Sequence, residues 1–239
     1  MNRQTLKVRV ASIPILGPGL RNASSAFARR QPFSGSNNYW ERRYSRGGNS
    51  GTGSHGRLAA AKADVLNRLV EEEGITSVLE LGCGDGNQLD LAKYPSYVGV
   101  DVSTSAIEAC RERFAHDQSK RFFVAGTEPL PDCELGLSLD VIYHLVEDDI
   151  FESYMDDLLS HSSRRLVLYT SDSDAFSPRG DPPPHIRHRP VSKWMASHPD
   201  WHLTRRIANP FPFQEFDQDN TSFADFYIFE RDPGSLVSR

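Results

Sequence analysis

Short apolar runs that end in glycine, acidic or polar residues divide most of the chain into alternating strands and helices. The runs at 77–81, 97–101, 121–125, 134–140 and 165–170 are short and apolar enough to be buried strands. Between them, apolar residues recur at helical spacing in 54–73, after Ser103 and in 148–160. Ser54 and Ser103 are the expected N-caps, and Gly74 the expected helix end. This alternation predicts an α/β protein with a doubly wound, mostly parallel sheet.

The C-terminal third changes character. A short helix is expected at 191–197, followed by aromatic-rich strands at 201–207 and 223–231 with a hairpin loop between them. These strands bring the expected sheet to seven. Residues 171–190 are rich in proline, histidine and arginine and form a long polar loop after a strand, which is typical of functional loops.

The most specific motif follows the first strand and reads E-x-G-x-G-x-G from Glu80 to Gly86. Glycine there permits positive φ and lets a ligand lie against the backbone, and the next residues are expected to begin a helix facing that ligand. Asp101 ends the second strand about twenty residues after Gly82, where an acid can accept both ribose hydroxyls. Glycine alone would predict an ordinary turn, but two acids at strand ends indicate a nucleoside cofactor. The third glycine comes too early for the dinucleotide motif G-x-G-x-x-G.

These motifs resemble the class I S-adenosylmethionine-dependent methyltransferases, and the segment YWERRY at 39–44 resembles one that precedes the first strand in bacterial members. The resemblance implies a Rossmann-like sheet with the last strand antiparallel and S-adenosylmethionine as cofactor. It implies that Asp101 binds the ribose. It assigns the other cofactor contacts to Glu80, Gly82, Cys83, Gly84, Asp85, Gly86, Val102, Gly126, Thr127 and Leu139.

Residues 38–53 combine aromatic side chains with arginines and run into a glycine-rich loop. We expect this segment to form a lid, with Tyr39, Trp40 and Tyr44 covering the cofactor. The alternative is that Trp40 and Tyr44 only pack an N-terminal helix onto the sheet.

Two residues after the fourth strand are the candidate catalytic groups. His144 is expected to accept a proton from the methyl acceptor, and Asp140 to orient it or the acceptor. The alternatives are a histidine hydrogen-bonded at a helix start and an aspartate that caps a strand. The predicted substrate-binding residues are Tyr143, His185, Arg187, His188 and Arg189. We expect no metal for two reasons. Tyr143 replaces the second acid of the E-x-x-E-H motif, whose acids assist metal binding in quinone-precursor methyltransferases. Pro199 interrupts the pair His198 and His202.

Composition limits the partners and the compartment. The 239 residues carry a net charge of −5, which argues against an obligatory nucleic-acid partner, and no apolar run approaches the ~20 residues that cross a bilayer. Three widely spaced cysteines indicate a reducing, cytoplasmic setting. Residues 1–37 form a basic arm that fits a mitochondrial transit peptide, a contact with an acidic partner or membrane surface, or a flexible tail. The catalytic domain is expected at 38–231, with a tail at 232–239.

The expected function is methyl transfer to an oxygen or nitrogen atom of a small polar metabolite or sugar-like acceptor, and the histidine and the polar loop favour oxygen. A cofactor-binding sensor or partner subunit without turnover is an alternative. A nucleic-acid methyltransferase has only the basic arm in its favour, and a nicotinamide-dependent oxidoreductase is disfavoured by the glycine spacing.

Overall fold

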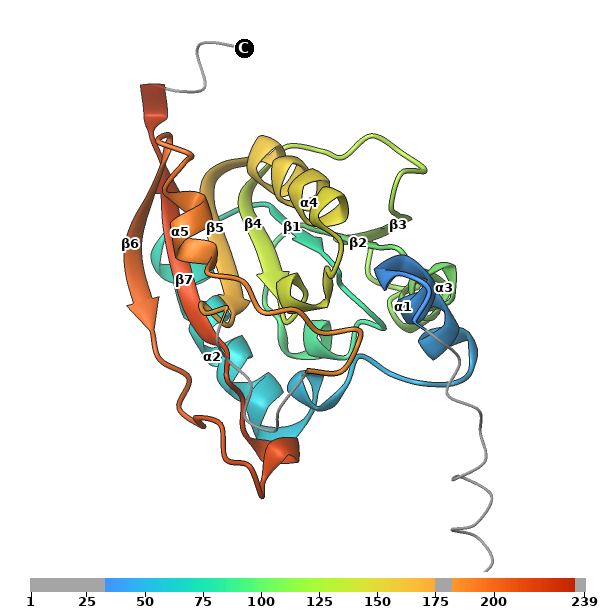
Figure 1. Cartoon of the computed structure of the whole chain (residues 1–239). Coiled ribbons are helices and arrows are strands. Elements are labelled where there is room, and N and C mark those ends of the chain that lie inside the picture. Colours follow the sequence, from blue (N-terminus) through green and yellow to red (C-terminus); the bar gives the residue numbers. More distant parts are fainter. Residues whose placement is uncertain (1–32, 175–181, 235–239) are drawn as a thin grey trace, which may run out of the picture. The chain divides into compact units, whose positions relative to one another are not determined.

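Seven strands form one sheet in the computed structural model, which describes residues 33–174 and 182–234 (Figure 1). The strand order is β3-β2-β1-β4-β5-β7-β6. The first five strands are parallel, and β7 lies antiparallel between β5 and β6. Their bounds are β1 Val78–Leu81, β2 Tyr97–Asp101, β3 Lys120–Val124, β4 Cys133–Leu139, β5 Ser162–Thr170, β6 Trp201–Ile207 and β7 Asp225–Arg231. This confirms the predicted seven-stranded, doubly wound sheet with an antiparallel strand near its end.

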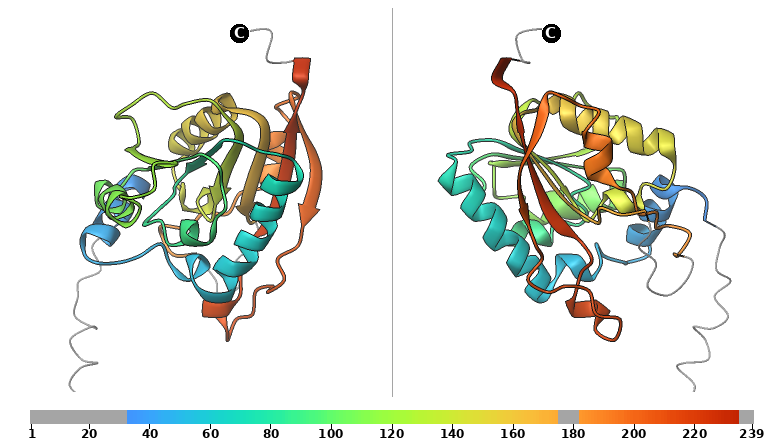
Figure 2. Two further views of the ribbon diagram at one scale, coloured as in Figure 1. Left: turned by 180° about the vertical axis from the view of Figure 1, so that it is seen from behind. Right: turned by 60° about the vertical axis from the view of Figure 1, so that its left-hand side comes forward.

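Helices cover both faces of the sheet (Figure 2). Side chains of α2 (Gly56–Glu72) and α3 (Thr104–Arg113) pack in one apolar cluster, and those of α4 (Asp148–His161) and α5 (Val191–Met195) in another. Strand β1 serves both clusters, because Val78 belongs to the first and Leu79 and Leu81 to the second. The N-terminal helix α1 (Ser36–Ser45) lies beside α3 (Figure 1).

The prediction of a helix directly after the glycine loop is wrong. In the fully described segment 82–96 the chain forms only a 3₁₀ turn, Gln88–Leu91, before it enters β2. The glycine loop uses the first residues of this segment and Pro95 stands near its end, so too little chain remains for a regular crossover helix.

Two details of the helices differ from the predicted pattern. Ser54 belongs to a 3₁₀ turn, Thr52–Ser54, and α2 begins at Gly56 with His55 at its N-cap. The buried face of α2 includes Lys62, which is not part of the predicted apolar pattern. The Ser103 cap is confirmed, since its side chain accepts a hydrogen bond from the Ala106 amide.

Residues 1–32, 175–181 and 235–239 lie outside the described residues, so most of the predicted arm and part of the tail have no structural counterpart here. Among the described residues, no helix is both long enough and apolar enough to cross a membrane.

Candidate active site

A cavity of about 380 Å³ opens where the carboxyl ends of β1, β2 and β4 meet, at the point where the strand order reverses. Ten of the predicted cofactor residues line it: Trp40, Tyr44, Glu80, Gly82, Cys83, Gly84, Asp101, Val102, Gly126 and Leu139. The predicted catalytic residues Asp140 and His144 line the same cavity. Tyr39, Asp85, Gly86 and Thr127 are not among its lining residues. The structure therefore brings most of the predicted cofactor residues together with both candidate catalytic groups.

Asp101 joins the glycine loop to the end of β2. Its Oδ2 accepts a hydrogen bond from the Gly84 amide at 2.9 Å, and its Oδ1 accepts one from the Ser103 amide at 2.9 Å. Burial of the carboxyl raises its pKa to about 6. Each carboxylate oxygen has a second lone pair, so Asp101 retains acceptor capacity for two hydroxyl groups.

Glu80 places a second buried carboxyl on the neighbouring strand. Its Oε2 accepts a hydrogen bond from the Tyr97 hydroxyl at 2.7 Å, and burial raises its pKa to about 7. Nearby, the Gln88 Oε1 is buried and makes no hydrogen bond within the described part of the chain, although Gln88 lines the cavity. An excess of acceptor atoms over donors suits a ligand that brings hydroxyl, ammonium or sulfonium groups, as S-adenosylmethionine does.

Glycine is required at two positions of the loop by the protein's own packing. Gly82 has φ 81, and a Cβ there would lie 2.4 Å from Val141 Cγ2. Gly84 has φ 58, and a Cβ there would lie 2.3 Å from Ser50 Oγ. The segment before α2 thus approaches the loop closely, which the sequence did not indicate.

The aromatic segment closes over the cavity as a helix followed by a loop. Tyr44 lines the cavity, and its hydroxyl lies 3.0 Å from Ser50 Oγ, which donates to Asp85 Oδ1 at 2.7 Å. On the same helix, Glu41 accepts a hydrogen bond from the Ser105 hydroxyl at 2.9 Å. Asp85 therefore fastens this covering segment to the glycine loop instead of facing the cavity. The two expectations for the aromatics are not exclusive, because the same side chains line the cavity and pack the helix.

His144 lies in a 3₁₀ turn, Ile142–His144, and is held by the polar loop. Its Nδ1 lies 3.0 Å from the His185 carbonyl oxygen, and its ring meets Trp40 edge-on at a centroid distance of 4.8 Å. A carbonyl only accepts, so Nδ1 carries the proton and Nε2 the free lone pair. Burial lowers the pKa of His144 to about 4, and the positive charge of Arg43 acts in the same direction. The imidazole is therefore neutral at pH 7.

Asp140 makes its hydrogen bonds away from His144. It has φ 62, the one positive φ outside glycine among the described residues. Lys62 Nζ lies 2.6 Å from its Oδ2, and the Tyr143 hydroxyl donates to its Oδ1 at 2.9 Å. The Lys62 side chain is only 2 % exposed and also lies over the Tyr169 ring at 5.2 Å. Sequence reasoning missed Lys62, although a lysine on the apolar face of a helix was the available signal.

None of the five predicted substrate-binding residues lines the cavity. Tyr143 binds Asp140, and His188 Nδ1 lies 2.6 Å from the Ser171 hydroxyl. The His185 ring stacks on Tyr39 at a centroid distance of 4.3 Å, while its carbonyl holds His144. Tyr143 and His185 therefore hold the lining residues Asp140 and His144 from outside the cavity.

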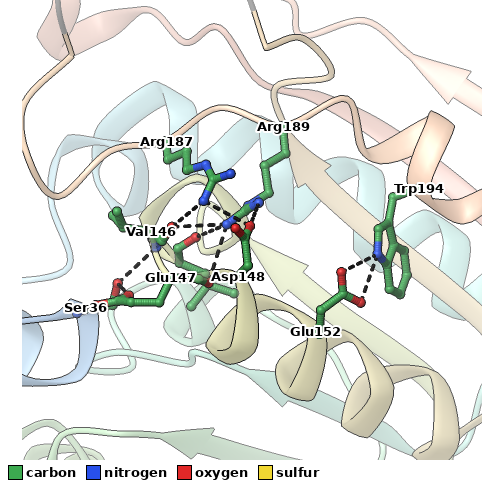
Figure 3. Close-up of polar contacts among 9 residues, drawn as sticks. Ser36, Val146, Glu147, Asp148, Glu152, Arg187, Arg189 and Trp194 are labelled. Atoms are coloured by element: carbon green, nitrogen blue, oxygen red, sulfur yellow. Dashed lines mark hydrogen bonds and ion pairs between the residues drawn. The ribbon is translucent and has the colours of Figure 1, made fainter.

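The two arginines fix the start of α4 (Figure 3). Arg189 donates to the carbonyl oxygens of residues 145, 146 and 147 at 3.1, 3.2 and 3.4 Å and pairs with Asp148 at 2.6 Å. Arg187 donates to the Val146 carbonyl and pairs with Asp148, both at 2.9 Å. Ser36 of α1 reaches the same place, its hydroxyl donating to Glu147 at 2.6 Å (Figure 3). In the structure these two predicted substrate-binding arginines hold the start of α4, because both guanidinium groups are bound to Asp148 and to backbone carbonyl oxygens.

The histidines weighed as metal ligands have other neighbours. His198 stacks on Trp194 at 4.1 Å, and His202 lies 3.0 Å from Asp232. Within residues 33–174 and 182–234, no group of three His, Cys, Asp or Glu side chains is arranged to hold a metal ion.

Solved methyltransferase structures share the fold of this chain at low sequence identity. The N-methyltransferase NodS from Bradyrhizobium japonicum WM9, crystallised with S-adenosyl-L-homocysteine, is 15% identical; 82% of this chain and 98% of that chain align with a TM-score of 0.63. The magnesium protoporphyrin IX methyltransferase ChlM from Synechocystis PCC 6803 is 15% identical over 82% and 98% of the two chains, with a TM-score of 0.58. The methyltransferase domain of bacterial CtHen1 is 17% identical over 72% and 98%, with a TM-score of 0.55.

No curated protein matches the sequence. A family model described as a methyltransferase domain matches residues 78–165, which contain the glycine loop, Asp101, Asp140 and His144. The structural likenesses establish the fold, and the matched domain adds the reaction class. The chain therefore has the fold of the class I S-adenosylmethionine-dependent methyltransferases, and its residues 78–165 match a methyltransferase domain.

Proposed function

We propose that the protein transfers the methyl group of S-adenosylmethionine to an oxygen or nitrogen atom of a small polar acceptor held beside His144 and Asp140. One observation carries this proposal. The buried carboxyls of Glu80 and Asp101 line the same cavity as His144, Asp140 and Trp40, so a cofactor and an acceptor bound there would lie in contact.

The roles of the residues follow from their bonds. The cofactor, when bound, supplies a methyl group activated by a sulfonium. Asp101 offers its two free lone pairs to ribose hydroxyls, and Glu80 offers a carboxylate to a positively charged part of the ligand. Trp40 and Tyr44 cover the cavity and exclude water, which aids alignment of donor and acceptor.

The cavity that cofactor and acceptor would share is of modest size. A cavity of about 380 Å³ is near the lower limit of the ~300–1,000 Å³ found for small-molecule sites. The His144 Nε2 lone pair can accept a hydrogen bond from the hydroxyl or amino group that is methylated. Similar folds include enzymes named for N-methylation and for a magnesium porphyrin, so the fold alone leaves the acceptor open. We place the enzyme in the cytoplasm, because its three widely spaced cysteines indicate a reducing setting. We expect it to act on a small molecule and not on nucleic acid, because its net charge is −5.

Calorimetric titration with S-adenosylmethionine and S-adenosylhomocysteine tests the proposal. We expect micromolar binding by the wild-type chain and at least tenfold weaker binding by Asp101→Asn, which keeps one acceptor oxygen but loses the charge. Phe216→Ala is the matched control, because Phe216 is 98% exposed and is not a lining residue. Equal binding by Asp101→Asn and the wild type would refute the assigned pocket. Cofactor binding without transfer to any acceptor would favour the sensor alternative.

A further inference from the structure

The charge of the cavity lining is strongly asymmetric. Five carboxyl side chains line the cavity: Glu80, Asp101, Glu128, Asp140 and Asp157. Among the described lining residues the one lysine or arginine is Lys62, whose ammonium group is paired with Asp140. His161 also lines the cavity and is bonded to Asp132 at 2.9 Å. A cleft lined by one sign of charge concentrates ligands of the opposite sign.

The arginines that a negatively charged acceptor would need are engaged elsewhere. Arg187 and Arg189 bind Asp148 and the carbonyl groups at the start of α4, and neither lines the cavity. A carboxylate or phosphate acceptor would meet acidic groups with no unpaired lysine or arginine among the described lining residues to offset them, and such like-charge contacts cost several kcal/mol. The lining therefore selects for acceptors that are neutral or positively charged.

The group beside the reacting atom is a hydrogen-bond acceptor, not a strong base. His144 presents its Nε2 lone pair, because Nδ1 is bonded to the His185 carbonyl. Burial lowers the pKa of His144 to about 4, so its imidazole is a weak base. An imidazole this weakly basic does not take a proton from an alcohol. A neutral amine needs no such base, since its own lone pair is the nucleophile.

We propose that the methyl acceptor of this site is a primary or secondary amine, an inference that rests on the proposed function. The ammonium form is drawn to the acidic cavity and gives one proton to water before reaction. The amine nitrogen then donates its lone pair to the methyl carbon while the carbon–sulfur bond breaks and its electron pair remains on sulfur. The positive charge moves from sulfur to the new methylammonium group, where the carboxylate of Asp140 stabilises it. This choice of nitrogen reverses the preference for oxygen drawn from the sequence, because the histidine is too weakly basic for a hydroxyl.

Binding to the protein loaded with S-adenosylhomocysteine provides the first test. Matched triples of amine, alcohol and carboxylate, such as benzylamine, benzyl alcohol and benzoate and their counterparts on linear and cyclic frames, are titrated by calorimetry. We expect amines to bind at least tenfold more tightly than their matched alcohols and carboxylates. Asp140→Asn should weaken amine binding about tenfold more than it weakens binding of the matched alcohols. Asp156→Asn is the control, because Asp156 is an exposed acid of α4 that is not a lining residue.

Turnover provides the second test. With S-adenosylmethionine, mass spectrometry should detect one added methyl on panel amines alone. The pH midpoint of the rate should move with the pKa of the amine when two amines of different basicity are compared. His144→Gln, which keeps a hydrogen-bond acceptor, should lower the rate less than about tenfold, whereas loss of a general base costs ~10²–10⁴-fold.

The outcomes separate the two proposals. Tighter binding or methylation of any alcohol or carboxylate, or no binding of any amine to the loaded protein, overturns the amine assignment. Failure of S-adenosylhomocysteine itself to bind contradicts the proposed function instead.

Discussion

Replacing Glu80 by glutamine should change how the stability of the unliganded protein depends on pH. Glutamine keeps an oxygen that can accept the Tyr97 hydrogen bond but cannot ionise. Burial raises the pKa of Glu80 from 4.5 to about 7, so the folded state holds this proton more tightly than the unfolded chain. The contribution of Glu80 to the free energy of unfolding should therefore be largest below about pH 4.5 and fall as the pH rises to 7 and just above.

The magnitude follows from the two pKa values. The difference between 4.5 and about 7, at roughly 1.4 kcal/mol for each pH unit, corresponds to about 3 kcal/mol. Urea unfolding at pH 4.5 and pH 8, followed by tryptophan fluorescence, gives the change for the wild type and for Glu80→Gln. We expect the wild type to lose about 3 kcal/mol more than the variant over this range. All other ionisable groups cancel in the comparison, and Glu108→Gln removes an exposed carboxyl of α3 as the control. Equal losses in the wild type and Glu80→Gln would refute the raised pKa of this buried acid.

Three further results are expected. Binding of S-adenosylmethionine at pH 6.5 should release protons, because hydroxyl donors and a sulfonium charge favour the ionised forms of Glu80 and Asp101, whose pKa values burial raises to about 7 and about 6. Calorimetry in phosphate and in imidazole buffer should then give different heats, and identical heats would contradict this. Gly84→Ala should weaken cofactor binding at least tenfold, because its Cβ would lie 2.3 Å from Ser50 Oγ. Gly47→Ala is the control for backbone strain alone, because Gly47 also has a positive φ, 78, but open space around a Cβ; this variant should bind the cofactor normally. Arg189→Met should lower the free energy of unfolding by about 3 kcal/mol, since it removes an 11% exposed side chain that binds three part-buried carbonyl groups and Asp148. Arg187→Met, at a side chain 45% exposed, should cost less than about 1 kcal/mol. The reverse order in urea unfolding would be inconsistent with the contacts at α4.

The features that the sequence predicted well are local. Glu80, the glycine loop and Asp101 stand directly at strand ends, where a few neighbouring residues determine both the conformation and the side exposed to the ligand. The Ser103 cap is equally local, since its partner is three residues away. For such features the pattern of residue types contains most of the necessary information.

The features that the sequence missed depend on partners far along the chain. Lys62 has the residue type of a solvated helix position, and only the arrival of Asp140 from another element makes its burial possible. The arginines of the polar loop have the composition of an anion site, but their guanidinium groups meet Asp148 and carbonyls about forty residues earlier. Composition suggested what these side chains can bind, and tertiary structure decided what they do bind.

The 3₁₀ turn that replaces a helix after the glycine loop has a consequence for ligand discrimination. A dinucleotide places its pyrophosphate at the first turn of an α-helix, where several free amides and the positive end of the helix dipole offset two negative charges. Residues 82–96 form no α-helix, and four residues of 3₁₀ turn supply little of that dipole. The neighbouring carboxyls of Glu80 and Asp101 would also repel phosphate groups. This part of the chain thus excludes nicotinamide dinucleotides by charge, while a nucleoside that carries a sulfonium and no phosphate meets no such barrier.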